Sequence, residues 1–145
     1  MTDKADILIS VDERHARNLI SGTKTLELRR RKINVEPGDR VWIYSKVPKG
    51  TVEAIGYVSS IYSASPTEIW QEFSECAGVS ESEFFEYYSG IELGHAIIFS
   101  EVTPLKIGIG LEDIRKHHQA FQPPQFFQRL TAASPILQLF QQAHA

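Results

Sequence analysis

The most telling part of the sequence reads Gly22-Thr23-Lys24-Thr25-Leu26-Glu27-Leu28-Arg29-Arg30-Arg31. Leu26 and Leu28 alternate with charged side chains, which is the pattern of a strand that buries one face. Gly22 stands where the left-handed end of a helix favours glycine. The stretch therefore predicts a helix that ends at Gly22, followed by a strand that carries Glu27 and Arg29 on the face opposite the leucines.

The segments on either side predict further elements. The apolar run over residues 7–11 predicts a buried strand, and the apolar stripe that follows Asp12 predicts the helix that ends at Gly22. A strand over 41–46 would place Trp42 and Tyr44 on one face. In a strand over 54–62, the glycine at position 56 indicates the close approach of another segment.

The second half of the chain predicts helices and two more strands. Ser65 and Ser80 are each followed, at the third position, by a glutamate, which is typical of a helix start. Strands are predicted over 94–102 and, at a sheet edge, over 104–109. Short helices are predicted over 111–117, 123–130 and 136–142. This order indicates an α+β domain, namely a small β-barrel of five to six strands with a helical insert and C-terminal helices.

Composition limits the kinds of site that the chain can carry. The 145 residues are enough for one domain with its own core. The single cysteine excludes an intramolecular disulfide and a metal site built from several cysteines. The five histidines lack the spacing of metal ligands, so we expect no metal and no cofactor. There is no apolar run of about 20 residues and no signal-peptide pattern, so we expect a cytoplasmic protein without a membrane contact.

Charge is distributed unevenly along the chain, whose formal net charge is -3. Residues 1–50 hold 11 of the 15 lysines and arginines and 7 acidic residues, whereas residues 51–145 hold 4 basic and 11 acidic residues. A partner that carries phosphate would prefer the first region. The alternative is that the two regions are solvated faces of opposite sign without a ligand.

Several motifs, in their order and spacing, resemble the ASCH domain family of the PUA-like superfamily. After the Gly-x-Lys corner come Lys24-Thr25-Leu26-Glu27-Leu28-Arg29, Pro37-Gly38-Asp39-Arg40-Val41-Trp42-Ile43-Tyr44, Ile55-Gly56-Tyr57-Val58, Gly94-His95-Ala96-Ile97 and Pro123-Pro124-Gln125-Phe126-Phe127. The resemblance covers roughly residues 5–130, which we expect to form a PUA-like domain. Residues 131–145 would form a C-terminal helix that packs on this domain or on a partner. The superfamily includes domains that bind RNA and modified bases.

The resemblance implies that Lys24, Glu27 and Arg29 line a cleft, and their chemistry agrees. A lysine suits a phosphate or a carbonyl oxygen, and the arginine fork matches a phosphate or a base edge. The third strand would end near the same mouth, where a tyrosine can stack on a base. The expected set for binding a ligand or nucleic acid is Lys24, Glu27, Arg29, Arg30, Tyr44, Ser45 and Lys46, with Arg14, Arg17 and Lys32 as further phosphate contacts. The alternative is an ordinary ion pair between Glu27 and Arg29 and a solubilising basic turn after it.

Three functions are compatible with this pattern. The favoured one is a module that binds RNA or a modified nucleotide, with a regulatory role in transcription or translation. The second is a hydrolase, either a ribonuclease or an acetylcytidine amidohydrolase, that uses Lys24, Glu27 and Tyr44. The amidohydrolase members have a threonine nucleophile at the position of Glu27, which argues against their chemistry here. The third is a protein-interaction domain or a homodimer that uses the apolar C-terminal helix, with Ile136, Leu137, Leu139 and Phe140.

Overall fold

The computed structural model describes residues 4–144, and its six strands form one mixed sheet. The strands are β1 (Asp6–Val11), β2 (Leu26–Arg29), β3 (Arg40–Ser45), β4 (Thr51–Ala64), β5 (Gly94–Gly110) and β6 (Gln128–Leu130). Their order across the sheet is β2-β5-β4-β3-β1-β6. Only the neighbours β1 and β3 run parallel, and the other neighbouring pairs are antiparallel. The α+β class is therefore confirmed.

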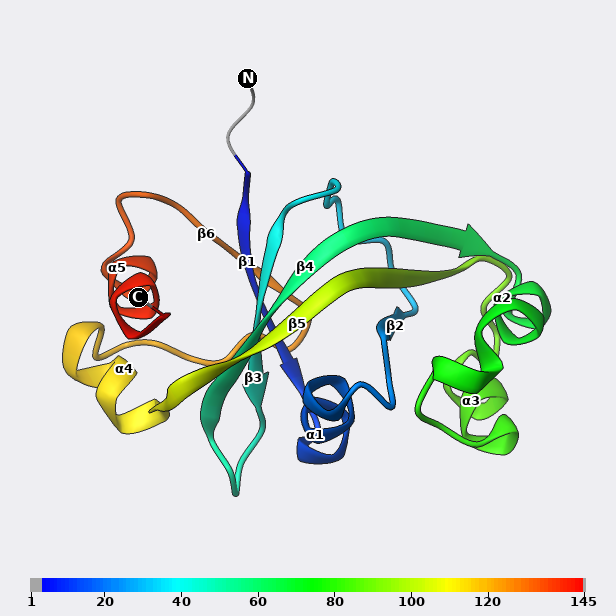
Figure 1. Ribbon diagram of the computed structural model, residues 1–145, viewed down its shortest axis with the longest axis horizontal. Helices are drawn as coiled ribbons and strands as arrows, with labels where there is room; N and C mark the ends of the chain where they lie inside the picture. The colour runs from blue at the N-terminus through cyan, green and yellow to red at the C-terminus, as the bar shows by residue number, and fades with distance from the viewer. Residues whose placement is uncertain (1–3, 145) are drawn as a thin grey trace.

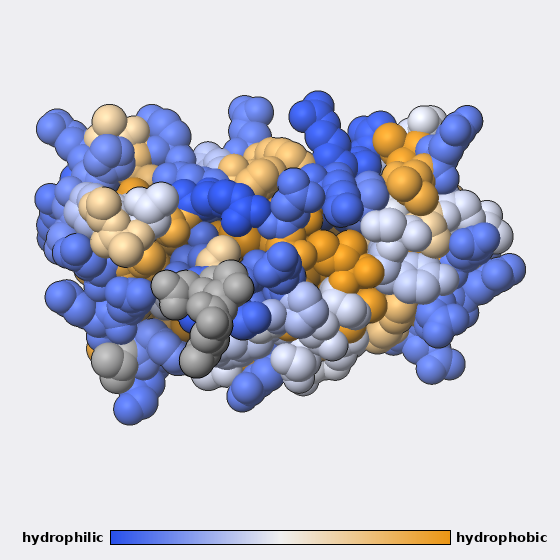
Figure 2. Space-filling model, turned by 90° about the horizontal axis from the view of Figure 1, so that it is seen from above, coloured by the Kyte–Doolittle hydropathy of each residue, from blue (hydrophilic) through white to orange (hydrophobic). Residues whose placement is uncertain are grey.

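Helices cover both ends of this sheet. They are α1 (Glu13–Ser21), α2 (Pro66–Phe73), the short 3-10 helix η1 (Ser74–Cys76), α3 (Glu81–Tyr87), α4 (Leu111–His117) and α5 (Pro135–His144). Figure 1 shows that β4 and β5 form a long curved ribbon with α2 and α3 at one end and α4 and α5 at the other. The face seen in Figure 2 is mostly hydrophilic toward these two ends, and hydrophobic side chains show between them. Among residues 4–144, no helix is long and apolar enough to cross a membrane.

The core has three parts because the central strands are buried on both faces. In β1, Ile7 and Ile9 pack with Leu19 of α1, whereas Leu8 packs on the other side with Trp42 and with residues of α4 and α5. The helical insert has its own cluster, formed by the aromatic side chains of α2 and α3 against the two leucines of β2. Along β5, Ile97 and Phe99 belong to the cluster under α1, whereas Ala96 and Ile98 belong to the insert cluster, so α1 and the insert pack on opposite faces of the sheet.

The predicted barrel is wrong, because the sheet stays open. β2 and β6 lie at its two edges, and within the described residues no backbone ladder joins them. Both strands are short, with four and three residues. A side chain bridges the gap instead: Nη1 of Arg29 donates a hydrogen bond of 3.0 Å to the carbonyl oxygen of Phe126, just before β6.

Several local predictions are confirmed. Gly22 has φ of 87° at the end of α1. Ser65 and Ser80 accept hydrogen bonds from the backbone N–H of the glutamate three residues later, and Ser80 completes a capping box with Glu83. At position 56, a Cβ atom would lie 2.7 Å from the ring of Phe99, so the close approach that glycine indicated is real.

Two predictions about the C-terminal half are wrong. The strands predicted over 94–102 and 104–109 are one continuous strand, β5. Its second half does lie at an edge of the sheet, because residues 104–109 pair with β4, whereas β2 pairs only with residues 95–98. The helix predicted over 123–130 is an irregular segment followed by β6, whose residues 128–130 pair with β1 instead. The C-terminal helix α5 packs on the domain, with Ile136 and Phe140 in the same core cluster as Trp42.

Candidate ligand-binding cleft

A cleft of about 390 Å³ opens where β1 ends and α1 begins. β2, the start of α1 and α3 of the helical insert all contribute to its walls, and Lys46 and Gln125 also line it. Lys46 is placed there because its backbone N–H bonds to the carbonyl oxygen of Val11, which aligns the ends of β3 and β1. The cleft therefore collects side chains from five separate parts of the chain.

Lys24 forms the floor of the cleft and is only 2% exposed. Its Nζ lies 3.0 Å from Nδ1 of His15 and 3.5 Å from Oε1 of Glu27. The position follows from the corner at Gly22, after which the N–H of Lys24 bonds back to the carbonyl oxygen of Asn18 in α1. A Cβ atom at Gly78 would lie 2.9 Å from Cδ of Lys24, so the insert closes directly over the lysine stem.

Glu27 lies between two cations in this floor. Its Oε1 faces Lys24, and its Oε2 lies 2.9 Å from Nη2 of Arg29. All three side chains are more than nine-tenths buried. Two positive groups and one negative group give the floor a formal charge of +1, which favours an anionic ligand.

Burial sets the protonation of the floor. The pKa of His15 is lowered, first by burial and then by the neighbouring Lys24. Burial also lowers the pKa of Lys24, although Glu27 opposes that shift. His15 is therefore mainly neutral at pH 7, and its Nδ1 can accept a hydrogen bond from the Lys24 ammonium. In that tautomer its Nε2 carries the proton.

The rim of the cleft carries two cations that are more exposed than those of the floor, and each is paired with a carboxylate. Arg14 of α1 lies 2.9 Å from Glu83 of α3, and Lys46 lies 3.7 Å from Asp12. The side chains of both cations are about half exposed, so a phosphate could compete with these carboxylates at low cost. Ser10 also lines the cleft, and its buried Oγ has no hydrogen-bond partner among residues 4–144.

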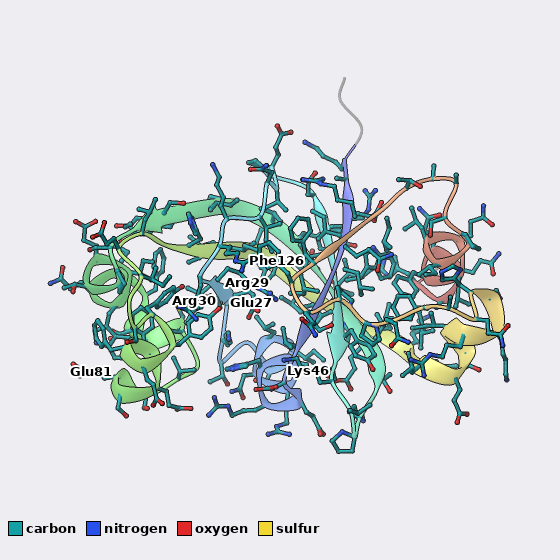
Figure 3. All side chains as sticks on the ribbon, turned by 180° about the vertical axis from the view of Figure 1, so that it is seen from behind. Glu27, Arg29, Arg30, Lys46, Glu81 and Phe126 are labelled. Carbon is teal, nitrogen blue, oxygen red and sulfur yellow. The ribbon has the colours of Figure 1, made fainter. Side chains whose placement is uncertain are left out.

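The structure brings together four of the seven predicted site residues, namely Lys24, Glu27, Arg29 and Lys46. Arg30 follows the end of β2 and lines a separate hollow, beside Arg29 and Phe126 (Figure 3). Of the further phosphate contacts, Arg14 lines the cleft, whereas Arg17 and Lys32 do not.

Tyr44 and Ser45 do not line the cleft. Tyr44 shares the face of β3 with Trp42 and is buried in the core toward α4 and α5, where burial raises its pKa. Ser45 is fully buried and donates a hydrogen bond to Glu53. Strand alternation explains the position of Tyr44, because a residue on the same face as Trp42 points away from the cleft. A hydrolase mechanism that uses Tyr44 therefore does not fit the position of this side chain.

Sequence reasoning missed Ser10, His15 and Tyr87, which also line the cleft. One feature of the sequence could have pointed to His15, namely its position in the first turn of the helix that follows β1. Tyr87 comes from the helical insert, and only the tertiary fold brings it near β2, where its hydroxyl donates to the carbonyl oxygen of Leu28 at 3.0 Å. No group of three or more metal-binding side chains occurs in the described part of the chain.

Comparisons with known proteins agree on one family, although no family model matches the chain. The chain is 29% identical over 123 residues to an ASCH domain-containing ribonuclease of Zymomonas mobilis, which covers 85% of this chain and 82% of that protein. The crystal structure of ASCH from the same organism matches with a TM-score of 0.88 at 27% identity, over 96% of each chain. A serine-to-alanine variant of it matches with a TM-score of 0.89 over 100% of each chain, at 26% identity. A hypothetical protein from Leishmania major, at 12% identity and a TM-score of 0.59, shares the fold. The chain is therefore similar, in sequence and in fold, to ASCH domain proteins over most of its length.

Proposed function

We propose that this protein binds single-stranded RNA in the cleft and cleaves it. The observation that carries the proposal is the buried row of Lys24, Glu27 and Arg29 on the cleft floor, which has an excess of positive charge. The similarity to a protein named a ribonuclease, over most of both chains, supports RNA as the substrate. Because of this similarity, we favour the hydrolase alternative over the binding module that the sequence pattern favoured.

The size and charge of the cleft favour a single strand. Its volume of about 390 Å³ is that of a pocket for a small ligand, so it suits one nucleotide of a flexible strand better than a stacked duplex. Lys24 and Arg29 would meet a phosphate at the floor, and Arg14 and Lys46 would meet one at the rim. The chain as a whole is acidic, with a pI near 5.9, which disfavours long contacts with a polyanion. Binding should therefore be local.

The floor also provides groups for phosphodiester cleavage. When the 2′-hydroxyl attacks phosphorus, it gives up its proton to solvent water, and the phosphorane gains negative charge, which the cations of Lys24 and Arg29 would stabilise. His15 can donate its Nε2 proton to the departing 5′-oxygen while its Nδ1 recovers a proton from Lys24, whose lowered pKa eases that transfer. His15 thus takes part in catalysis in place of Tyr44, which does not line the cleft.

The binding part of the proposal is tested by fluorescence anisotropy with a short single-stranded RNA. We expect Arg14→Ala and Lys46→Ala each to weaken binding about tenfold, since each removes a charge-assisted contact. Arg17→Ala is the matched control, because Arg17 is also in α1 but is 66% exposed and lies outside the cleft. Equal affinity of all three variants and the wild type would reject the cleft as the binding site.

The cleavage part is tested by incubating the same RNA with the wild type, Lys24→Met and His15→Asn. We expect both variants to lose cleavage by about a hundredfold or more, which is the usual range for a general acid or an electrostatic group. Arg17→Ala prepared in parallel should cleave at the wild-type rate, which excludes a contaminating nuclease. If the wild type binds the RNA and leaves it intact, the protein is a binding module and not a ribonuclease.

A further inference from the structure

A second hollow, of about 300 Å³, lies beside the cleft on the outer side of β2. It is lined by Arg29, Arg30, Arg31, Tyr87, Gln125 and Phe126. Arg29, Tyr87 and Gln125 also line the cleft, so the two hollows adjoin at these shared residues. Figure 3 shows Arg29, Arg30 and Phe126 gathered beside Glu27, away from the insert residue Glu81.

Arg29 lies at the junction with part of its hydrogen-bonding capacity unused. Its Nη1 donates to the carbonyl oxygen of Phe126. Its Nη2 is close to Glu27 without the geometry of a hydrogen bond, and its Nε has no acceptor among residues 4–144. The side chain is only 9% exposed, so these N–H groups cannot turn freely to water. A buried guanidinium with free donors is a site where an anionic oxygen would bind.

The outer side of the hollow adds two exposed arginines and two aromatic rings. Cζ of Arg31 lies 5.7 Å from the centroid of the Phe126 ring, and the Tyr87 side of the hollow remains open, since that residue is 41% exposed. Arg30 makes one long hydrogen bond, of 3.4 Å, to the carbonyl oxygen of Ser89. Neither Arg30 nor Arg31 has an ion-pair partner in the described part of the chain, unlike the rim cations of the cleft.

We propose that the second hollow is a subsite for the nucleotide that adjoins the one in the cleft. Arg30 and Arg31 neutralise its phosphate, and the exposed ring of Tyr87 stacks on its base. Arg29 binds the phosphate shared by the two nucleotides. Aromatic rings beside a basic track are the usual means of binding a single strand. The subsite rests on the proposed function, and it adds that the ligand extends over at least two nucleotides and passes along the outer side of β2.

The test compares a mononucleotide with a short strand. The probes are uridine 5′-monophosphate and a labelled 2′-O-methyl RNA tetranucleotide, which has no attacking hydroxyl and so reports binding alone. The variant is Arg30→Ala/Arg31→Ala, whose two side chains are exposed and can be removed without disturbing the core. Lys32→Ala is the matched control, since it removes an exposed cation from the same turn but lines a different hollow.

We expect the wild type to bind the tetranucleotide more tightly than the mononucleotide. The double variant should bind the tetranucleotide about tenfold more weakly and the mononucleotide as the wild type does. The salt dependence of tetranucleotide binding should fall by about 0.7 in log–log slope for each lost phosphate contact. Wild-type affinity of the double variant for the tetranucleotide would overturn the subsite while leaving the cleft assignment intact. Loss of mononucleotide binding in the double variant would overturn it too, and absence of binding by the wild type would reject cleft and subsite together.

Discussion

Arg29 donates a hydrogen bond of 3.0 Å to the carbonyl oxygen of Phe126 and so ties one edge of the open sheet to the other. Arg29 belongs to the edge strand β2, and Phe126 precedes the opposite edge strand β6. The same guanidinium faces Glu27 in the cleft floor. The Arg29 side chain therefore links the two edges of the sheet and also forms part of the cleft floor.

Arg29→Lys should lower the free energy of unfolding by about 1–3 kcal/mol, because it leaves the carbonyl of Phe126 without its donor. The positive charge beside Glu27 is retained, so the loss reports the hydrogen bond and not the ion pair. Urea denaturation followed by circular dichroism measures it. Arg31→Lys, at an exposed site two residues away, should change the same quantity by less than about 0.5 kcal/mol. Equal stability of the two variants would contradict a structural role for Arg29.

A second stability prediction concerns Asp6, whose buried carboxylate joins β1 to β3. It accepts hydrogen bonds from Nε and Nη2 of Arg40 at 2.7 and 2.8 Å, and from Nε1 of Trp42 at 2.9 Å. Asp6→Ala leaves the indole N–H buried without a partner, while Arg40, which is a third exposed, can return to water. We expect a loss of about 3 kcal/mol in the free energy of unfolding.

The control for Asp6→Ala is Asp113→Ala in α4. Asp113 pairs with Lys116 at 3.4 Å, but both side chains are well exposed. Its removal should change stability by less than about 0.5 kcal/mol. A similar loss in the two variants would show that the buried network of Asp6 contributes no more than a surface ion pair.

Much of the cleft floor could be predicted because it is local in sequence. Lys24, Glu27 and Arg29 lie within six positions, and the corner at Gly22 together with strand alternation puts them on one side of β2. His15 was harder to predict, since its contact with Lys24 depends on how α1 packs beside β2. The contribution of Tyr87 depends on where the helical insert folds back over the sheet.

The errors have a common cause in long-range packing. Alternation correctly placed Tyr44 on the face of Trp42, but it does not say which face of β3 looks toward the cleft. Barrel closure likewise depends on whether two edge strands are long enough to pair. Here β2 and β6 are too short, and a side chain spans the gap. Both outcomes depend on contacts between segments that are far apart in the chain. The hydrophobic periodicity of a single segment does not predict such contacts.

Close packing at Gly56 gives a third prediction. A Cβ atom there would lie 2.7 Å from the ring of Phe99, at a paired position of β4 in the sheet interior. Gly56→Ala should therefore destabilise the protein by about 1–3 kcal/mol through overpacking. Adding Phe99→Leu should recover part of the loss relative to the sum of the single variants. Strict additivity in thermal denaturation of all three variants would show that the two positions do not clash.

The last prediction is a pH dependence that arises from His15. Burial and the neighbouring Lys24 lower the pKa of His15 from its ordinary value of 6.5, so the unfolded chain takes up this proton at a higher pH than the folded one. The stability due to neutral His15 is complete above pH 6.5 and is lost as the pH falls from there through the lowered folded-state pKa. The free energy of unfolding, measured with urea between about pH 7.5 and pH 5, should decline less in His15→Asn than in the wild type. His118→Asn, at an exposed site, should decline as the wild type does. Parallel curves for His15→Asn and the wild type would mean that His15 is protonated as readily in the folded protein as in the unfolded chain, which would remove the basis for its Nδ1 accepting a proton from Lys24.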